Sequence, residues 1–228
     1  MMINAKLIPS IVDEVEVVKK VSEPIKEVEQ IQEIVSWLLK QARWRDCMLF
    51  VVGINLGLRV SDLTTLKFNQ FIDNNFKFKD TLSLFEQKTG KPRVLGINDT
   101  VKDVIRLYID NFDGEISLDR YLFVSEGNRG KNSDKPLTRM SIHRILKDIS
   151  LNLNLKINFS SHSLRKTFGH QLMSQNGNDP RTLLLLQRIF NHSSAMQTLT
   201  YIGLTDDEVF NSYNSLNYNI SSLATSEA

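Results

Sequence analysis

The chain has 228 residues, of which 41% are hydrophobic and 24% charged, with a formal net charge of +2. This composition excludes a wholly disordered chain, and the length is enough for one or two domains with a real core. The one cysteine, Cys47, excludes a disulfide framework and a zinc site made of several cysteines, and no apolar run approaches the roughly 20 residues of a membrane span. Because the acidic N-terminus is also unlike a signal peptide, we expect a globular protein of the cytoplasm with no membrane partner.

The first part of the chain predicts an arm followed by two helices. Residues 1–26 have no sustained hydrophobic period and contain two prolines, so we interpret them as a loose arm with room for one short helix. From Ile31 to Ala42 the apolar residues recur at the spacing of an amphipathic helix. The more uniformly apolar stretch 46–56 predicts a buried helix that ends at Gly57.

The next segment predicts a β-hairpin. Thr81–Phe85 and Arg93–Ile97 are short and rich in β-prone residues. The residues between them include Gly90 and Pro92, which are typical of a turn. We therefore expect two antiparallel strands here.

Six helices are predicted in the rest of the chain. Their expected N-caps include Asp99 or Thr100, Asp179 with proline at the first helical position, and Ser193 or Ser194. A polar loop at 126–136 separates the first two helices, and a capping-box sequence at 205–208 begins the last. The expected spans are about 100–112, 138–153, 163–175, 181–190, 194–201 and 205–218.

These elements predict a mainly α fold with a small antiparallel β-sheet, of the α+β class. We find neither an internal repeat nor a linker between residues 27 and 220. The expected organisation is therefore an arm at 1–26, a domain at 27–220 and a disordered tail at 221–228.

Charge is distributed unevenly along the chain. Residues 1–34 contain four lysines and seven acidic residues, and residues 205–228 contain four acidic residues and no Lys or Arg. Residues 35–204 therefore carry a net charge of +9. A basic body between acidic ends is compatible with an ordinary basic surface, and it also indicates a polyanionic partner such as nucleic acid.

Four short segments become informative when they are taken together. They read GLRVSDL at 57–63, KTGK at 88–91, HSLR at 162–165 and NHSS at 191–194, and Tyr201 follows His192 by nine residues. This ordered set resembles the catalytic domain of the tyrosine recombinases, the phage integrase family, over roughly residues 28–218. The resemblance implies six catalytic residues: Arg59, Lys88, His162, Arg165, His192 and Tyr201.

The family's chemistry explains why these residue types occur together. DNA cleavage by a protein hydroxyl passes through a phosphorane-like state, and the forked, permanently charged guanidinium groups of Arg59 and Arg165 suit its oxygens. The resemblance implies that Tyr201 is the nucleophile of a 3′-phosphotyrosyl bond. Lys88, the first lysine of the K-x-x-K turn, is implied to protonate the leaving 5′ oxygen, with Lys91 as the nearby alternative.

The two remaining residues are implied to assist at the phosphate. His192 donates a hydrogen bond to it, and His162 helps to move the proton of the nucleophile. Such a reaction needs neither metal nor cofactor. Double-stranded DNA is the implied partner, with a homo-oligomer on DNA, the synaptic tetramer, and a monomer allowed without it.

Taken singly, each residue also has a structural interpretation. Arg59, Lys88 and the His162–Arg165 pair are compatible with solvated or salt-bridged surface residues, and Tyr201 with a half-buried core tyrosine. We expect Asp62, about one turn after Arg59, to orient that arginine rather than to react. Metal binding by the histidines is disfavoured because they lack helical ligand spacing and a carboxylate partner. The complete set in family order favours the functional interpretation.

The sequence departs from the family pattern in three places. Phe190-Asn191 stands where the family usually has Leu-Gly, and Asn tolerates the left-handed backbone that glycine provides there. Lys166 replaces a frequent His after the second arginine, adding a phosphate contact or altering the rate. Only residues 1–26 precede the catalytic domain, where most members have a core-binding domain, so the chain is either a natural short member or a fragment.

Three functions are compatible with the sequence. The first is a site-specific recombinase or integrase that cleaves and rejoins DNA. The second is a recombinase-like DNA-binding regulator with little or no activity, and the third is a relaxing enzyme like the type IB topoisomerases. The helix expected at 205–218 has one apolar face, which packs either on its own domain or, as the resemblance implies, on a neighbouring catalytic domain.

Overall fold

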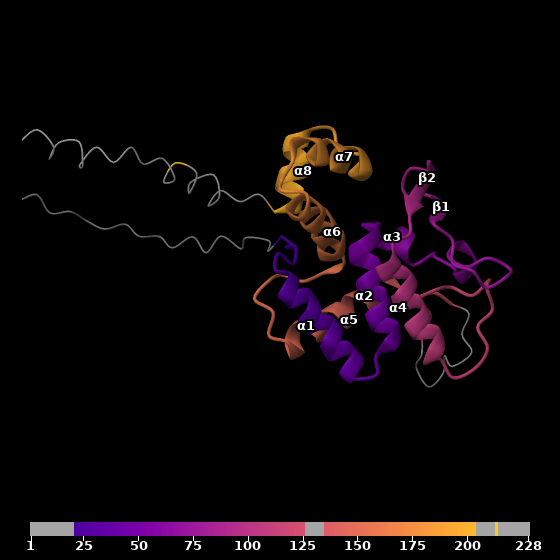
Figure 1. The fold of residues 1–228 in the computed structure, drawn as a ribbon. Coiled ribbons are helices and arrows are strands. Elements are labelled where there is room, and N and C mark those ends of the chain that lie inside the picture. The colour runs from indigo at the N-terminus through magenta and orange to yellow at the C-terminus, as the bar shows by residue number, and fades with distance from the viewer. Residues whose placement is uncertain (1–20, 126–134, 204–212, 214–228) are drawn as a thin grey trace, which may run out of the picture.

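The computed structural model describes residues 21–125, 135–203 and 213 (Figure 1). These residues form α-helices, one short 3-10 helix and a two-stranded antiparallel sheet, which confirms the expected fold class. In chain order the elements are α1 (Val28–Lys40), α2 (Trp44–Leu56), α3 (Val60–Leu63), η1 (Phe68–Gln70), β1 (Thr81–Phe85), β2 (Pro92–Gly96), α4 (Asp99–Asp110), α5 (Arg139–Asn152), α6 (Ser161–Gln175), α7 (Pro180–Phe190) and α8 (Ala195–Ile202). Within this described part, no helix has the length and apolar character needed to cross a membrane.

The main core is built around α2. Nine of its 13 residues are buried, because its apolar side chains point to all sides rather than to one face. Helices α1, α4 and α6 pack against it (Figure 1). Strand β1 adds Leu82, which is fully buried, to the same core.

The expected hairpin is confirmed. In β1 and β2, Thr81 pairs with Gly96 and Phe85 with Pro92. Between the strands, the backbone N–H of Gly90 donates to the carbonyl of Glu86 (2.7 Å), and Gly90 has the positive φ of 66° that favours glycine. This turn carries the KTGK segment.

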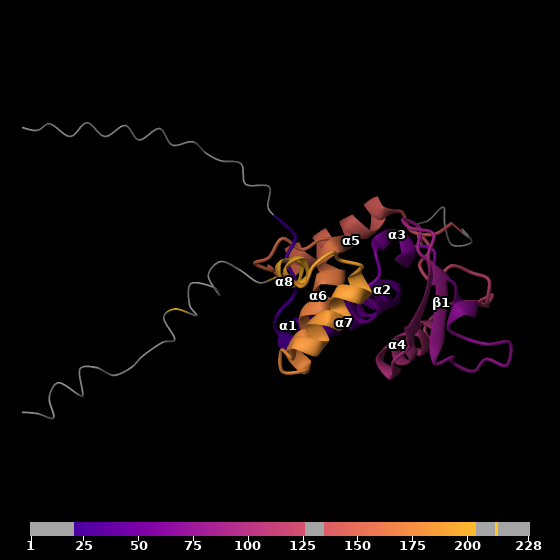
Figure 2. The same cartoon turned by 90° about the horizontal axis from the view of Figure 1, so that it is seen from above.

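A second, smaller core lies between α6, α7 and α8. Its buried residues are Met173, Leu186, Phe190 and Ile202. Figures 1 and 2 show α7 and α8 over one end of α6, with the hairpin on the other side of α3. The residues that the structure describes therefore form two hydrophobic clusters, and α6 contributes to both.

The end of the expected arm is not loose where the structure describes it. Ile25 is fully buried, and its backbone N–H donates to the hydroxyl of Thr167 on α6 (2.8 Å). The side-chain amide of Gln171 donates to the carbonyls of Ile25 and Lys26 (3.1 and 2.8 Å). The hydrophobic pattern of the sequence does not predict this contact, because residues 21–27 form neither a helix nor a strand.

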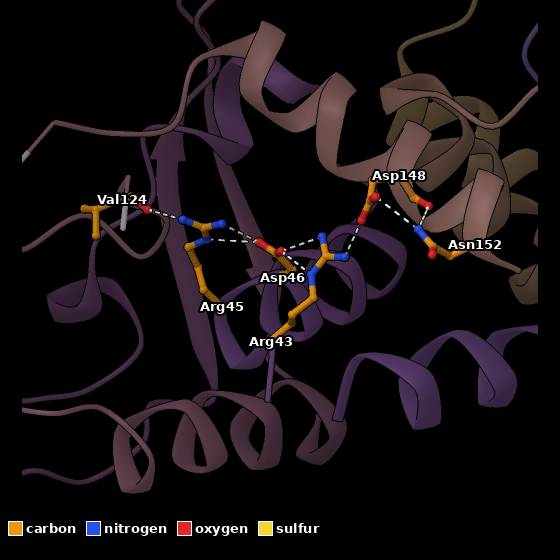
Figure 3. A network of polar contacts seen from close by, with 6 residues as sticks. All are labelled: Arg43, Arg45, Asp46, Val124, Asp148 and Asn152. Carbon is orange, nitrogen blue, oxygen red and sulfur yellow. Dashed lines mark hydrogen bonds and ion pairs between the residues drawn. The ribbon is translucent and has the colours of Figure 1, made fainter. Parts of the chain in front are cut away.

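A buried carboxylate fixes the start of α2. Asp46 is 5% exposed and accepts hydrogen bonds from Arg43 and Arg45 (Figure 3). Arg43 also pairs with Asp148 on α5, and Arg45 donates to the carbonyl of Val124 (3.1 Å). Because a buried charge is costly unless it is paired and hydrogen-bonded, these contacts let Asp46 join α2 to two distant segments.

Several boundaries differ from the expected ones. The N-cap of α4 is Asn98, whose side chain accepts from the N–H of Val101, rather than Asp99 or Thr100. The sequence analysis did not predict α3 or η1, because they are too short to show a period. The caps Asp179 and Ser194 are confirmed. Most of the polar loop at 126–136, nearly all of 205–218 and the tail at 221–228 lie outside the described residues.

Candidate active site

All six candidate residues line one cleft of about 590 Å³. They come from four parts of the chain: the start of α3, the turn between β1 and β2, the start of α6, and the α7–α8 pair. The six are Arg59, Lys88, His162, Arg165, His192 and Tyr201. Their convergence is a property of the fold, because their segments are far apart in the sequence.

Arg59 stands at the N-cap position of α3 in extended backbone. Its Nη1 donates to Oε2 of Glu86 at 3.0 Å, and about a quarter of its side chain remains exposed. The guanidinium is therefore anchored through one nitrogen while the side chain lines the cleft.

Arg165 is buried, with 4% exposure. Its Nη1 donates to the carbonyl of Gly57, the left-handed residue that ends α2, and its Nη2 donates to the carbonyl of Phe190 at the end of α7 (3.3 Å). Burial lowers the pKa of Arg165 to about 10, so the group stays charged at neutral pH. A buried cation held by two carbonyls and facing a cleft is well suited to an anionic ligand.

The turn that carries Lys88 is tied to the α3 segment. The backbone N–H of Gln87 donates to Oδ1 of Asp62 (2.8 Å), and the hydroxyl of Thr89 donates to Glu86 (2.9 Å). Lys88 itself is exposed and lines the cleft. The backbone of the turn is thus held while the lysine side chain faces solvent.

His162 lies in the first turn of α6, beside several cations. Burial lowers its pKa, and the charges of Arg139, Lys166 and Arg165 lower it further. Because the ordinary pKa of histidine is about 6.5, His162 is neutral at neutral pH. It is therefore able to accept a proton there.

His192 is positioned by the residue before it and by a threonine. Asn191 ends α7 in the left-handed conformation (φ 55°, ψ 48°), which confirms the expectation for this departure from glycine. Nδ1 of His192 lies 3.1 Å from the hydroxyl oxygen of the fully buried Thr198. Burial, followed by the charges of Arg165 and Arg59, lowers the pKa of His192, so this imidazole is also neutral at neutral pH.

Tyr201 on α8 packs among aromatic rings and cations. Its ring centroid is 5.2 Å from that of Phe190 and 5.1 Å from that of His192, and Nζ of Lys166 lies 5.2 Å from the ring centroid. Burial raises the pKa of Tyr201, and Arg165, followed by Arg59, opposes that rise. The phenol is thus protonated at rest and lies within the influence of both arginines.

Several residues that contact or line the site were not predicted, and three of them bond a candidate residue or add charge to the cleft. Glu86, rather than Asp62, bonds the Arg59 side chain, so the expectation that Asp62 orients this arginine is wrong. Arg139 at the start of α5 also lines the cleft, and Thr198 bonds His192. No motif marks Glu86, Arg139 or Thr198. The one signal in the sequence is that the acidic Glu86 directly follows the β-prone segment Thr81–Phe85.

Comparison with known proteins identifies the family. The model of the phage integrase family matches residues 25–208. This chain belongs to that family. It is 35% identical over 185 residues to the "Probable integrase/recombinase YoeC" of Bacillus subtilis (strain 168), covering 81% of this chain and 91% of that protein. It is 26% identical to the "Tyrosine recombinase XerD" of Staphylococcus haemolyticus (strain JCSC1435), covering 83% of this chain and 60% of XerD.

Solved structures show the same fold for this integrase-family chain. The XerA recombinase superposes with a TM-score of 0.61 at 21% identity, over 86% of this chain and 65% of that chain. The Tn1549 transposon integrase superposes with a TM-score of 0.58 at 19% identity, over 87% of this chain and 67% of that one. The integrase-family chain therefore has the fold of a tyrosine recombinase catalytic domain and spans less than two thirds of XerD and XerA.

Proposed function

We propose that this chain is a site-specific recombinase or integrase that cleaves and rejoins DNA strands through Tyr201, with residues 27–220 as its catalytic domain. One observation carries the proposal: a tyrosine, two arginines, two neutral histidines and a lysine from four segments line the same cleft. Membership of the phage integrase family supports it. The structures of XerH bound to its difH substrate and of Tn1549 integrase bound to DNA show that relatives with this fold bind DNA.

In the proposed reaction, the protein holds the scissile phosphate by its non-bridging oxygens. Arg165 provides a fixed, buried charge, and Arg59 provides a second guanidinium in the same cleft. His192 adds a hydrogen bond through Nε2. For this, Nδ1 must accept the proton of the Thr198 hydroxyl, whose other acceptor is the carbonyl of Ser194 (3.3 Å). The ring proton of the neutral imidazole then lies on Nε2.

Cleavage then exchanges one phosphorus–oxygen bond for another. The Tyr201 oxygen attacks phosphorus and gives its proton to His162, while the bond from phosphorus to the 5′ oxygen breaks and that oxygen takes a proton from Lys88. The product is a 3′-phosphotyrosyl bond and a free 5′ hydroxyl. Attack by a 5′ hydroxyl reverses the step, so the phosphodiester is reformed without an external energy source.

The proposed partner is double-stranded DNA, bound by copies of this chain that assemble as a tetramer during strand exchange. The net charge of +9 on residues 35–204 supports a polyanionic partner. The free, buried thiol of Cys47 is compatible with action in the cytoplasm.

The decisive experiment replaces Tyr201 by Phe. The phenyl ring keeps the contacts with Phe190 and His192 and loses only the attacking oxygen. On a nicked suicide duplex, the wild type should form a denaturant-resistant protein–DNA adduct and Tyr201→Phe should form none, while both bind the duplex with similar affinity. An adduct from the Phe variant would show that another residue is the nucleophile. Binding without any adduct from the wild type would instead support a DNA-binding regulator.

A further inference from the structure

A buried carboxylate connects two parts of the proposed active site. Glu86 is 7% exposed and lies where β1 runs into the turn that carries Lys88. Its Oε2 accepts hydrogen bonds from Arg59 (3.0 Å) and from the hydroxyl of Thr89 (2.9 Å), and its Oε1 accepts one from Arg93 (3.1 Å). One side chain thus contacts the phosphate-binding arginine and the residue next to the lysine.

The contacts of Glu86 are not those of a general structural ion pair. Arg93 lies directly on the neighbouring strand and would suffice to pair the buried carboxylate. The additional bonds reach Arg59, which lines the cleft, and Thr89, which follows the cleft-lining Lys88. They hold the guanidinium and the turn at fixed positions relative to each other.

The charge of Glu86 has opposite consequences for DNA affinity and for the orientation of the residues that it contacts. A carboxylate beside Arg59 reduces the positive charge that the cleft offers to a phosphate, so it does not favour DNA binding. Hydrogen bonds from Thr89 and the two arginines lower the pKa of Glu86 despite its burial, so it keeps this unfavourable charge at neutral pH. The benefit of Glu86 must therefore lie in the orientation of its partners.

We propose that Glu86 is a positioning residue of the cleavage reaction, which fixes Arg59 and the turn that carries Lys88 in one arrangement. This inference rests on the proposed function. It assigns two separable effects to Glu86: orientation of the phosphate clamp through Arg59, and delivery of the acid through Thr89.

The test compares Glu86→Gln, which removes the charge, with Thr89→Val, which leaves Arg59 paired with Glu86. Thr89→Val removes the bond from the turn to Glu86, together with the bond that the Thr89 hydroxyl accepts from the N–H of Lys91 (3.3 Å) within the turn. For both variants, DNA affinity and the single-turnover rate of adduct formation are measured separately. We expect Glu86→Gln to bind DNA at least as tightly as wild type and to cleave up to about 100-fold more slowly, because a displaced catalytic group costs about that much. Asp103→Asn, an acid-to-amide change on the exposed surface of α4, is the matched control and should cleave like wild type.

A second substrate distinguishes the two effects. In DNA with a 5′-bridging sulfur at the cleavage site, the leaving thiolate needs no acid, because a thiol ionises near pH 8.5. Thr89→Val should therefore regain the wild-type rate on this substrate. Glu86→Gln should regain only part of it, because Arg59 remains poorly oriented.

Three outcomes would overturn the proposal. Glu86→Gln could cleave normal DNA at the wild-type rate, or it could lose affinity and rate in the same proportion, as a merely structural residue would. If Glu86→Gln does not fold, as judged by circular dichroism, an unchanged rate for Thr89→Val on normal DNA would overturn it. Failure of the wild type to form any adduct would instead contradict the proposed function itself.

Discussion

Arg59 and the Lys88 turn stand on the main core, whereas His192 and Tyr201 stand on the small cluster formed with α7 and α8. Among the described residues, the main core contains 30 buried hydrophobic residues and the small one contains four. Leu184 and Met196, on α7 and α8, remain about 60% exposed. The half of the cleft that carries Arg59 and Lys88 is thus much more firmly supported than the half that carries His192 and Tyr201.

Arg165 joins these two halves. Its guanidinium donates to Gly57 at the end of α2 and to Phe190 at the end of α7. In the proposed reaction the same group binds the phosphate, so one side chain has a structural and a chemical role. The position of Tyr201 in the cleft therefore depends on a few contacts rather than on a large interface.

After Tyr201→Phe, the largest expected effects come from replacing each arginine by lysine. Either change keeps the charge and loses the forked pair of donors of the guanidinium, which should slow adduct formation on the order of 10²–10³-fold. Arg165→Lys should also lower the free energy of unfolding by about 1–3 kcal/mol, because buried carbonyls lose a donor. Arg59→Lys should cost less than about 1 kcal/mol, since its ion pair is partly exposed.

Urea denaturation and single-turnover cleavage measure these two quantities. Equal stability losses for Arg59→Lys and Arg165→Lys would mean that Arg165 does not join the halves. Undiminished cleavage by either variant would remove that arginine from the phosphate clamp.

A pair of glycines tests the two cores more directly. A Cβ on Gly169 would lie 2.6 Å from Ile202 and 2.9 Å from Phe190 in the small cluster, and a Cβ on Gly53 would lie 2.8 Å from Leu164 in the main core. Each alanine variant should lose about 1–3 kcal/mol of stability through overpacking. Gly169→Ala should also slow cleavage by the folded protein, because it displaces α8 and with it Tyr201.

The control in this pair is Gly53→Ala, which should leave the cleavage rate of the folded protein near that of wild type. DNA affinity should be unchanged in both variants. Equal effects on cleavage from the two substitutions would show that the halves are coupled as one rigid body.

The pH dependence of cleavage should reflect the pKa values of His162 and His192, which burial and, after it, neighbouring cations lower. The pKa values of His162 and His192 are lowered below the ordinary value near 6.5, so each ring binds its proton only at a lower pH. Adduct formation at subsaturating DNA should therefore be constant at neutral pH and fall only on the acid side, as His162 loses its ability to accept a proton. The exposed His143 on α5 offers a control, since His143→Gln should leave the profile unchanged. A rate that already falls between pH 8 and 7 would contradict this assignment.

Local sequence predicted most helices and the hairpin, and the resemblance to the family predicted six of the residues that line the cleft. The periodicity of α1 and α4, the Asp179 cap and the K-T-G-K turn are signals carried by neighbouring residues. Contacts between segments distant in sequence were not predictable in this way. The pairing of Arg59 with Glu86 and the burial of Ile25 against α6 depend on the packing of the whole chain, which one sequence does not encode as a local pattern.

The smallest expected effect concerns the tautomer of His192. Thr198 is fully buried, and its hydroxyl lies 3.1 Å from Nδ1 of that ring. Thr198→Val keeps the shape and removes the hydroxyl. In the proposed reaction, that hydroxyl donates to Nδ1 rather than to the carbonyl of Ser194 (3.3 Å) and so places the ring proton on Nε2. Because a neutral hydrogen bond contributes about 0.5–1.5 kcal/mol, cleavage should slow by a factor of about two to ten with unchanged DNA affinity.

Thr198→Ser, which retains the hydroxyl, should restore most of the rate and is the matched control. If Thr198→Val cleaves at the wild-type rate while Tyr201→Phe is inactive, then His192 needs no tautomeric control. Thr198 would in that case only pack beside the ring, and His192 would donate to the phosphate without it.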